Sequence, residues 1–260
     1  MAVYKNILFI IGSVLLGCES KFVDTITKCS IKDSDCHKQV VQGVLKNLGK
    51  GIPEKNIPPI DPMKITNVSV DVLGVGNLTL VDGVVLGITD CKVAKFETSI
   101  EDEHAAMDLI CDITIKGQVS VFSDHEIVKN LLGMEKVDTQ GYGKAKMEKV
   151  KIHIDYFFNI EERDGKTFIH CKFNNTIYSY DVEKMTFDAK GFEINGVDMS
   201  SSFKNILNQF WKVAMSVVGK TFMDKAMVFV YDYTHKFFDF TPTDEYLSDT
   251  DLMKYVKKSF

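Results

Sequence analysis

Six cysteines, at positions 18, 29, 36, 91, 111 and 171, are the residues whose side chains could bond covalently to one another. Cys29 and Cys36 flank a short polar loop just ahead of an amphipathic stretch, and a bridge there would tie the mature N-terminus to the start of a helix. We therefore predict a Cys29–Cys36 disulfide. Cys111 and Cys171 share the alternation of their apolar neighbours, so both should face the core, either as a bridged pair or as two buried thiols.

The residue patterns of common catalytic sites are missing from the sequence. It contains no Gly-x-Ser-x-Gly, no His-Glu-x-x-His, no phosphate-binding glycine loop and no Cys-x-x-Cys. The Asp33-Ser34-Asp35 turn has no further oxygen ligands at calcium-loop spacing, so we interpret it as a solvated loop. We expect no catalysis, no metal and no cofactor, and we interpret as ordinary polar residues the histidines at 37, 104, 125, 153, 170 and 235.

The N-terminus has the layout of a secretory signal peptide over residues 1–18, with cleavage between 17 and 21. Acceptor sequences for N-glycosylation at Asn67, Asn77 and Asn174 agree with a secreted, extracellular glycoprotein. The formal net charge is −5 and the lysines are dispersed, which argues against a nucleic-acid partner. The sequence carries no signal for oligomeric state.

The stretch from Ser201 to Phe238 is expected to form one long helix with apolar residues on more than one face. Its lysines and aspartates interrupt the apolar run too often for a membrane span, so we expect no stable membrane insertion. Gly219 is where we expect a bend. A helix this apolar must be covered by the rest of the chain.

The preceding residues supply the covering elements. A helix is predicted from Ser34 to Leu48, and four prolines then enforce an extended connector over residues 51–62. Apolar and polar residues alternate after it, which predicts an antiparallel sheet with one wet face, with strands at 65–73, 78–86, 92–100, 107–115, 149–161, 166–173 and 177–187. We expect one α+β domain over residues 19–247 and a tail at 248–260 that is a surface appendage or a frayed end.

Several motifs resemble the takeout and juvenile-hormone-binding protein family of arthropods. Cys29, Asp33 and Cys36 are followed by Gly51-Ile52-Pro53-Glu54 and Ile57-Pro58-Pro59-Ile60-Asp61-Pro62, as in the family's N-terminal signature. Leu207-Asn208-Gln209-Phe210-Trp211 and Asp244-Glu245-Tyr246 are similar to its C-terminal segments. The resemblance spans about residues 22 to 247. It implies a tubular lipid-binding (TULIP-like) fold, in which a strongly curved antiparallel sheet wraps the long helix around an apolar cavity.

Unbranched and aromatic side chains on the long helix could form a deformable surface for a flexible apolar ligand. We predict ligand contacts at Phe210, Trp211, Met215, Phe222 and Met227, with the N-terminal helix as a lid through Val40, Val44 and Leu48. Two functions stay open: an extracellular carrier of a small hydrophobic ligand such as a juvenile-hormone-like terpenoid or a fatty acid, or a secreted structural or interaction protein with a filled cavity.

Overall fold

The computed structural model describes residues 25–53, 56–72, 74–133 and 135–256, so the predicted signal peptide lies outside the described residues. Its main helices and strands, in chain order, are α1 (Ser34–Asn47), β1 (Met63–Asp71), β2 (Asn77–Leu86), β3 (Lys92–Ser99), β4 (His104–Ser123), α2 (Glu126–Leu132), β5 (Val137–Arg163), β6 (Lys166–Cys171), β7 (Ile177–Lys190), β8 (Glu193–Ile194), β9 (Val197–Asp198), α3 (Ser200–Gln209) and α4 (Trp211–Asp239). Short 3-10 helices are η2 (Leu48–Lys50), η4 (Phe173–Asn175), η5 (Thr243–Glu245) and η6 (Met253–Tyr255).

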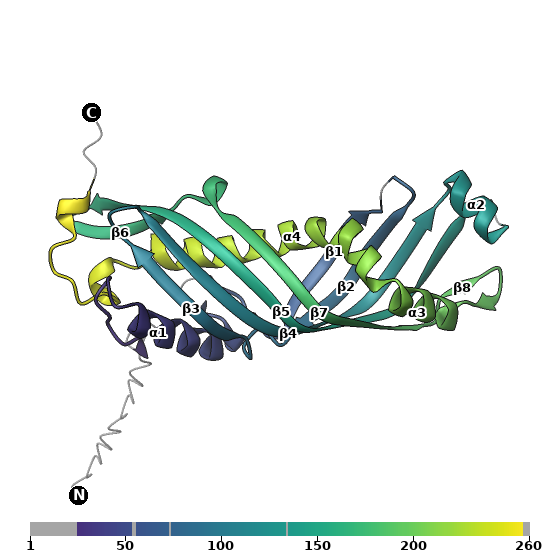
Figure 1. The fold of residues 1–260 in the computed structure, drawn as a ribbon, viewed down its shortest axis with the longest axis horizontal. Helices are drawn as coiled ribbons and strands as arrows, with labels where there is room; N and C mark the ends of the chain where they lie inside the picture. Colours follow the sequence, from purple (N-terminus) through teal and green to yellow (C-terminus); the bar gives the residue numbers. More distant parts are fainter. Residues whose placement is uncertain (1–24, 54–55, 73, 134, 257–260) are drawn as a thin grey trace, which may run out of the picture.

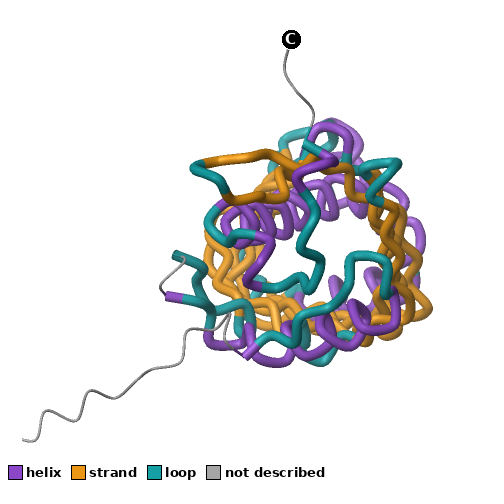
Figure 2. Tube along the Cα trace, turned by 90° about the vertical axis from the view of Figure 1, so that its left-hand side faces the viewer, coloured by secondary structure: helices purple, strands orange, loops and turns teal. Residues whose placement is uncertain are grey.

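Two very long strands, β4 and β5, form the centre of the antiparallel sheet. β2 and β3 both pair with β4, while β6 and β7 both pair with β5, and β1 extends the sheet beyond β2. In Figure 1 these strands run obliquely across the long axis, along which α4 lies. Viewed from one end, strands and helices form a ring (Figure 2). The α+β fold with a curved sheet around the C-terminal helix is therefore confirmed.

A row of glycines marks the middle of the sheet. Gly83, Gly117 and Gly143 lie opposite one another on three neighbouring strands. A Cβ atom on Gly117 would lie 2.2 Å from the carbonyl oxygen of Asp82, so only glycine allows the two strands to approach this closely. The register also shifts between Leu80 and Asp82, which marks a bulge beside Gly83. Close approach and the bulge let the sheet curve around the helix.

The C-terminal helix is interrupted at Phe210, so it is not the one continuous helix predicted over 201–238, and Gly219, where we expected a bend, lies inside α4. α3 ends at Gln209 and α4 begins at Trp211, and Phe210 leaves the helical conformation with φ −114° and ψ 23°. The side-chain amide of Asn208 exchanges two hydrogen bonds of 2.8 Å with the backbone of Phe187, which ties the last turn of α3 to β7. Gly219 instead permits close packing, because its Cβ would lie 2.5 Å from the Tyr180 hydroxyl.

The predicted Cys29–Cys36 disulfide is present, with the two Cα atoms 5.8 Å apart. A second bridge joins Cys91, just before β3, to Cys111 on β4. A bridge between Cys111 and Cys171 is therefore ruled out, and Cys171 is a buried free thiol. Strand parity placed Cys111 and Cys171 correctly on the inner face but could not reveal that Cys91 lies beside Cys111.

In the C-terminal tail, the expectation of a surface appendage or frayed end is wrong for Leu252, which is buried, whereas the other residues of 248–256 are exposed or only partly buried. Leu252 is only 4% exposed and packs with Ile31 and Tyr246. The Asp249 carboxylate accepts hydrogen bonds from the Ile31 amide (2.6 Å) and the Ser30 hydroxyl (3.2 Å). These contacts fasten the C-terminal segment across the N-terminal one at the end of the molecule where α1 begins.

Candidate ligand-binding cavity

A cavity of about 280 Å³ lies between α1, the β3–β6 part of the sheet and the C-terminal half of α4. Most of its walls are aliphatic and aromatic, and none of its described lining residues is Asp, Glu, Lys or Arg. The lining residues are Ile26, Cys29, Ile31, His37, Val40, Val41, Val44, Leu48, Ile52, Ile57, Phe96, Thr98, Ala105, Met107, Tyr156, Phe158, Ile169, Cys171, Tyr233, Thr234, Phe237, Phe238, Tyr246 and Leu247. Such a space suits an apolar molecule.

The structure separates the predicted site residues into two groups. Val40 and Val44 of α1 and Leu48 of η2 line the cavity. The five residues predicted at the N-terminal side of the long helix lie outside the lining of this cavity: Phe210, Trp211, Met215, Phe222 and Met227. The cavity instead meets α4 near its C-terminal end, at Tyr233, Thr234, Phe237 and Phe238.

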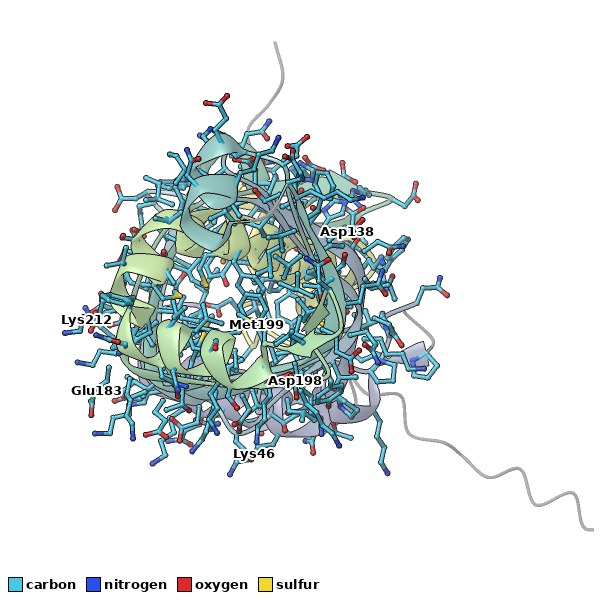
Figure 3. All side chains as sticks on the ribbon, turned by 90° about the vertical axis from the view of Figure 1, so that its right-hand side faces the viewer. Lys46, Asp138, Glu183, Asp198, Met199 and Lys212 are labelled. Atoms are coloured by element: carbon cyan, nitrogen blue, oxygen red, sulfur yellow. A yellow bond between two sulfur atoms is a disulfide. The ribbon has the colours of Figure 1, made fainter. Side chains whose placement is uncertain are left out.

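Most of those five residues meet protein atoms instead. Trp211 and Met215 pack against the core around the Cys91–Cys111 bridge, and Met227, 5% exposed, packs with Met107 and Ile154. Phe210, at the helix break, is 51% exposed. Figure 3 shows the end of the molecule that lies on the right in Figure 1, where Met199 lies toward the middle of the tube and Lys46, Glu183 and Lys212 lie outside. Because Trp211 packs in the core and does not line the cavity, its fluorescence is no direct reporter of the cavity.

Sequence reasoning missed the polar side chains of the cavity. His37 lies with its ring centroid 5.7 Å from that of Phe96, and burial lowers its pKa, so the imidazole is neutral at neutral pH. Burial raises the pKa of the Tyr156 and Tyr246 hydroxyls, which also stay neutral. Burial likewise raises the pKa of Cys171 to about 12 and keeps its thiol protonated. The alternation of the strand predicted at 149–161 could have identified Tyr156, because Tyr156 shares the parity of the apolar Ile154 and Phe158.

α1 is held over the cavity at two points. The Cys29–Cys36 bridge fastens its first turn, where the Asp33 carboxylate also caps the Cys36 amide at 3.0 Å. In its middle, the Gln42 side-chain amide donates to the carbonyl of Cys91 and accepts from the amide of Val93, both at 2.9 Å. The helix is therefore a well-anchored wall of the cavity.

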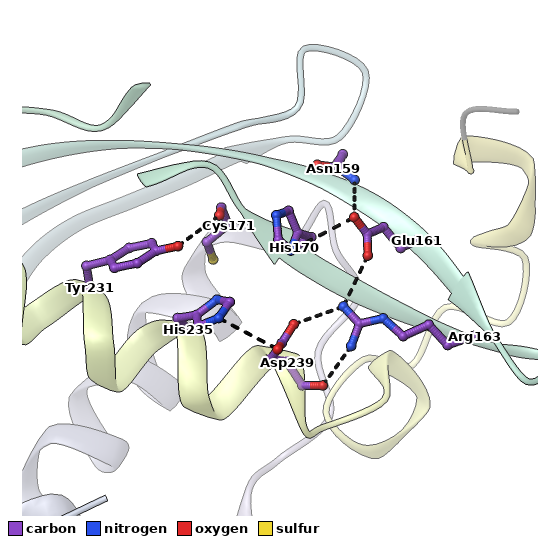
Figure 4. Close-up of polar contacts among 8 residues, drawn as sticks. All are labelled: Asn159, Glu161, Arg163, His170, Cys171, Tyr231, His235 and Asp239. Carbon is purple, nitrogen blue, oxygen red and sulfur yellow. Dashed lines mark hydrogen bonds and ion pairs between the residues drawn. The ribbon is translucent and has the colours of Figure 1, made fainter. Parts of the chain in front are cut away.

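A polar cluster lies behind the opposite wall, between β5, β6 and the end of α4 (Figure 4). Arg163 Nη2 contacts Asp239 Oδ1 at 2.9 Å and Glu161 Oε2 at 3.1 Å, and its Nη1 donates to the Asp239 carbonyl at 3.0 Å. His170 Nδ1 lies 3.9 Å from Glu161 Oε1, and His235 Nε2 lies 3.6 Å from Asp239 Oδ2. The cluster binds the end of α4 to the hairpin that carries Ile169 and Cys171.

The acid stability of the fold should depend on this cluster. Burial by itself raises the pKa of Glu161 and Asp239, but hydrogen bonds from Asn159 and Arg163 to Glu161 and from Arg163 to Asp239 hold both values below the ordinary ones. A carboxyl group whose pKa is lower in the folded state than in the unfolded state stabilises the fold at any pH above its ordinary pKa. This stabilisation is lost as the pH falls through the pKa of the folded state.

The Arg163→Gln variant is expected to unfold about 1 kcal/mol more easily than the wild type at pH 7, a modest cost because these side chains are partly exposed. The difference should be smaller at pH 3 than at pH 7, because the carboxyl groups begin to be protonated as the pH falls toward their lowered folded pKa values. Urea unfolding at both pH values measures it, with the exposed Lys166→Gln as control. An equal difference at the two pH values would show that Arg163 acts through packing alone.

Comparison with known proteins shows to which family the chain belongs. The sequence profile of the family described as "Haemolymph juvenile hormone binding protein (JHBP)" matches residues 7–248. The chain belongs to this family. The JHBP family consists of binding proteins, so the chain is a binding protein and not an enzyme. Among the described residues there is no group of side chains that could hold a metal ion, and none of the described helices is long and apolar enough to cross a membrane.

Comparison with solved structures gives two further likenesses. "Takeout 1" of Epiphyas postvittana superposes with a TM-score of 0.74 at 20% identity, covering 85% of this chain and 99% of that one. A lipopolysaccharide binding protein gives a TM-score of 0.43 at 11% identity, over 80% of this chain and 39% of the other. No protein with a curated description matches the sequence closely. The likeness to Takeout 1 confirms the fold that the JHBP resemblance implied.

The three glycosylation acceptors of this JHBP member lie at the surface. Asn67 on β1, Asn77 at the start of β2 and Asn174 in η4 are all exposed. Each asparagine is therefore accessible, and its modification stays a prediction.

Proposed function

We propose that this protein is an extracellular carrier that holds a small hydrophobic ligand, such as a juvenile-hormone-like terpenoid, a fatty acid or a related lipid, without changing it chemically. The observation that carries the proposal is the apolar cavity of about 280 Å³ under α1. Burying a ligand there gains about 25 cal/mol for each Å² of apolar surface removed from water. Membership in the JHBP family supports a carrier role.

Secretion is proposed on independent grounds. The N-terminal apolar run, the two disulfides and the exposed glycosylation acceptors all suit the oxidising secretory route. N-terminal sequencing of protein from the culture medium tests this, and an intact Met1 there would contradict cleavage between 17 and 21.

Ligand binding is tested by two measurements on the secreted protein. An organic extract analysed by mass spectrometry should contain a copurified lipid, and the delipidated protein should bind the apolar fluorophore N-phenyl-1-naphthylamine at one saturable site. If neither extracted lipid nor saturable binding is found, the carrier proposal fails. The protein would then be a structural or interaction protein that keeps this fold.

A further inference from the structure

A second hollow of about 290 Å³ lies against the cavity, on a neighbouring face of α1. It is bounded by α1 and by the segment of residues 25–27 that crosses it. Ile26, Val40 and Val44 line both spaces. The inner cavity and this outer groove therefore meet at one strip of apolar side chains.

The helical period explains why one helix serves both spaces. Successive residues of α1 are about 100° apart around the helix axis, at 3.6 residues per turn. Residues 37, 41 and 48 line the inner cavity, while residues 36, 39, 43 and 47 line the outer groove, and Val40 and Val44 lie between the two stripes. A molecule that passes these two valines would touch both stripes.

The two spaces differ in chemistry. Thr27, Gln39 and Asn47 give the outer groove hydroxyl and amide groups, and none of its nine described lining residues is charged. The described lining of the inner cavity is mostly hydrocarbon and has no Asp, Glu, Lys or Arg, and its His37 is neutral because burial lowers the pKa. Among the described lining residues, neither space has a cation that would pair with a carboxylate or phosphate.

The size of the inner cavity limits the apolar part of a ligand. A water molecule takes about 30 Å³ of liquid volume and a methylene group takes a similar volume, so 280 Å³ has room for at least about nine such groups. A chain of about ten carbons therefore fits the cavity, and a longer ligand or its polar head extends outside it. Val40 and Val44, which line both spaces, are the residues where the outer groove is nearest.

We propose that the ligand is an amphiphile with an uncharged hydrogen-bonding head, whose chain fills the inner cavity and whose head lies in the outer groove beside Gln39 and Asn47. This inference rests on the proposed carrier function and specifies the class of its ligand. Alcohols and acylglycerols have such heads, whereas ionised fatty acids do not.

Gly43 offers a direct test because it lies in the groove and a Cβ atom there would meet nothing within 4 Å. Gly43→Trp fills the groove, and Gly43→Ala is the matched control that leaves it open. Competitors with ten-carbon chains, namely 1-monodecanoylglycerol, decanoate and decane, displace N-phenyl-1-naphthylamine at pH 7.5. Inhibition constants are corrected for the fluorophore affinity of each variant.

For the wild type and Gly43→Ala, monodecanoylglycerol should bind at least tenfold more tightly than decanoate. Gly43→Trp should weaken the binding of monodecanoylglycerol at least tenfold and change the affinity for decane less than threefold. Gln39→Leu, which removes only the exposed amide, should weaken monodecanoylglycerol selectively and serves if Gly43→Trp does not fold.

The inference is overturned, with the carrier function still standing, if the wild type binds decanoate as tightly as monodecanoylglycerol. It is likewise overturned if Gly43→Trp and Gln39→Leu bind monodecanoylglycerol as tightly as Gly43→Ala does. Failure of every competitor and of the fluorophore to bind the wild type overturns the carrier function itself.

Discussion

Replacing Leu252 with alanine is expected to lower the free energy of unfolding by about 3 kcal/mol, since truncation of a buried leucine to alanine typically costs a protein about 2–5 kcal/mol of stability. Leu252 is 4% exposed and packs with Ile31, Tyr246 and Leu247 where the two terminal segments cross. For a chain of this size such a loss lowers Tm by roughly 6–12 °C. Thermal and urea unfolding of the variant measure both quantities.

The neighbouring residue supplies the control. Met253 is 50% exposed, so Met253→Ala should change the stability by less than about 0.5 kcal/mol. If Leu252→Ala is as stable as Met253→Ala, the tail is an appendage and the packing of residues 248–256 described above contributes nothing to stability.

Replacing Ala105 with tryptophan is expected to weaken ligand binding more than a hundredfold. Ala105 lies on β4, opposite Tyr156, and lines the cavity. An indole ring in this space displaces about four methylene groups of the ligand, each contributing about 0.8 kcal/mol, which together amount to about 3 kcal/mol. Titration with N-phenyl-1-naphthylamine measures the change in affinity.

The same substitution at Ala94 separates cavity filling from the general effect of added bulk. Ala94 is exposed on β3 and does not line the cavity, so Ala94→Trp should bind the fluorophore as the wild type does. Ala105→Leu is a smaller change that should give an intermediate loss. Unaltered binding by folded Ala105→Trp would place the ligand elsewhere in the tube.

Local patterns were enough to predict most of the elements and the α+β class, although they missed α2 and residues 137–148 of β5 and joined α3 and α4 into one helix. The strand predicted at 149–161 is confirmed as part of β5, because a strand with one buried face repeats every two residues. The spacing of Val40, Val44 and Leu48 correctly predicted α1 and its inward stripe, which now lines the cavity. The short loop between Cys29 and Cys36 was enough to predict their bridge.

Contacts between distant segments lay beyond such patterns. Cys91 bonds to Cys111 because β3 and β4 pair, and Leu252 is buried because the terminal segments cross; both depend on long-range pairing. The long helix is interrupted at Phe210, two residues after Asn208, whose side chain bonds to the distant backbone of Phe187, and helix propensity contains no information on such a contact.

The position of the cavity was decided in the same way. α4 is apolar along its whole length, so its sequence predicted a covered helix but not which part would remain unfilled. The sheet fills the space beside Met215 and Met227 and leaves a cavity beside Tyr233 and Phe237. A void is a difference between the space that the backbone encloses and the volume of side chains from many elements. The sequence by itself therefore determined that this protein has an apolar helix to cover, and only the tertiary structure decided where a ligand could lie against it.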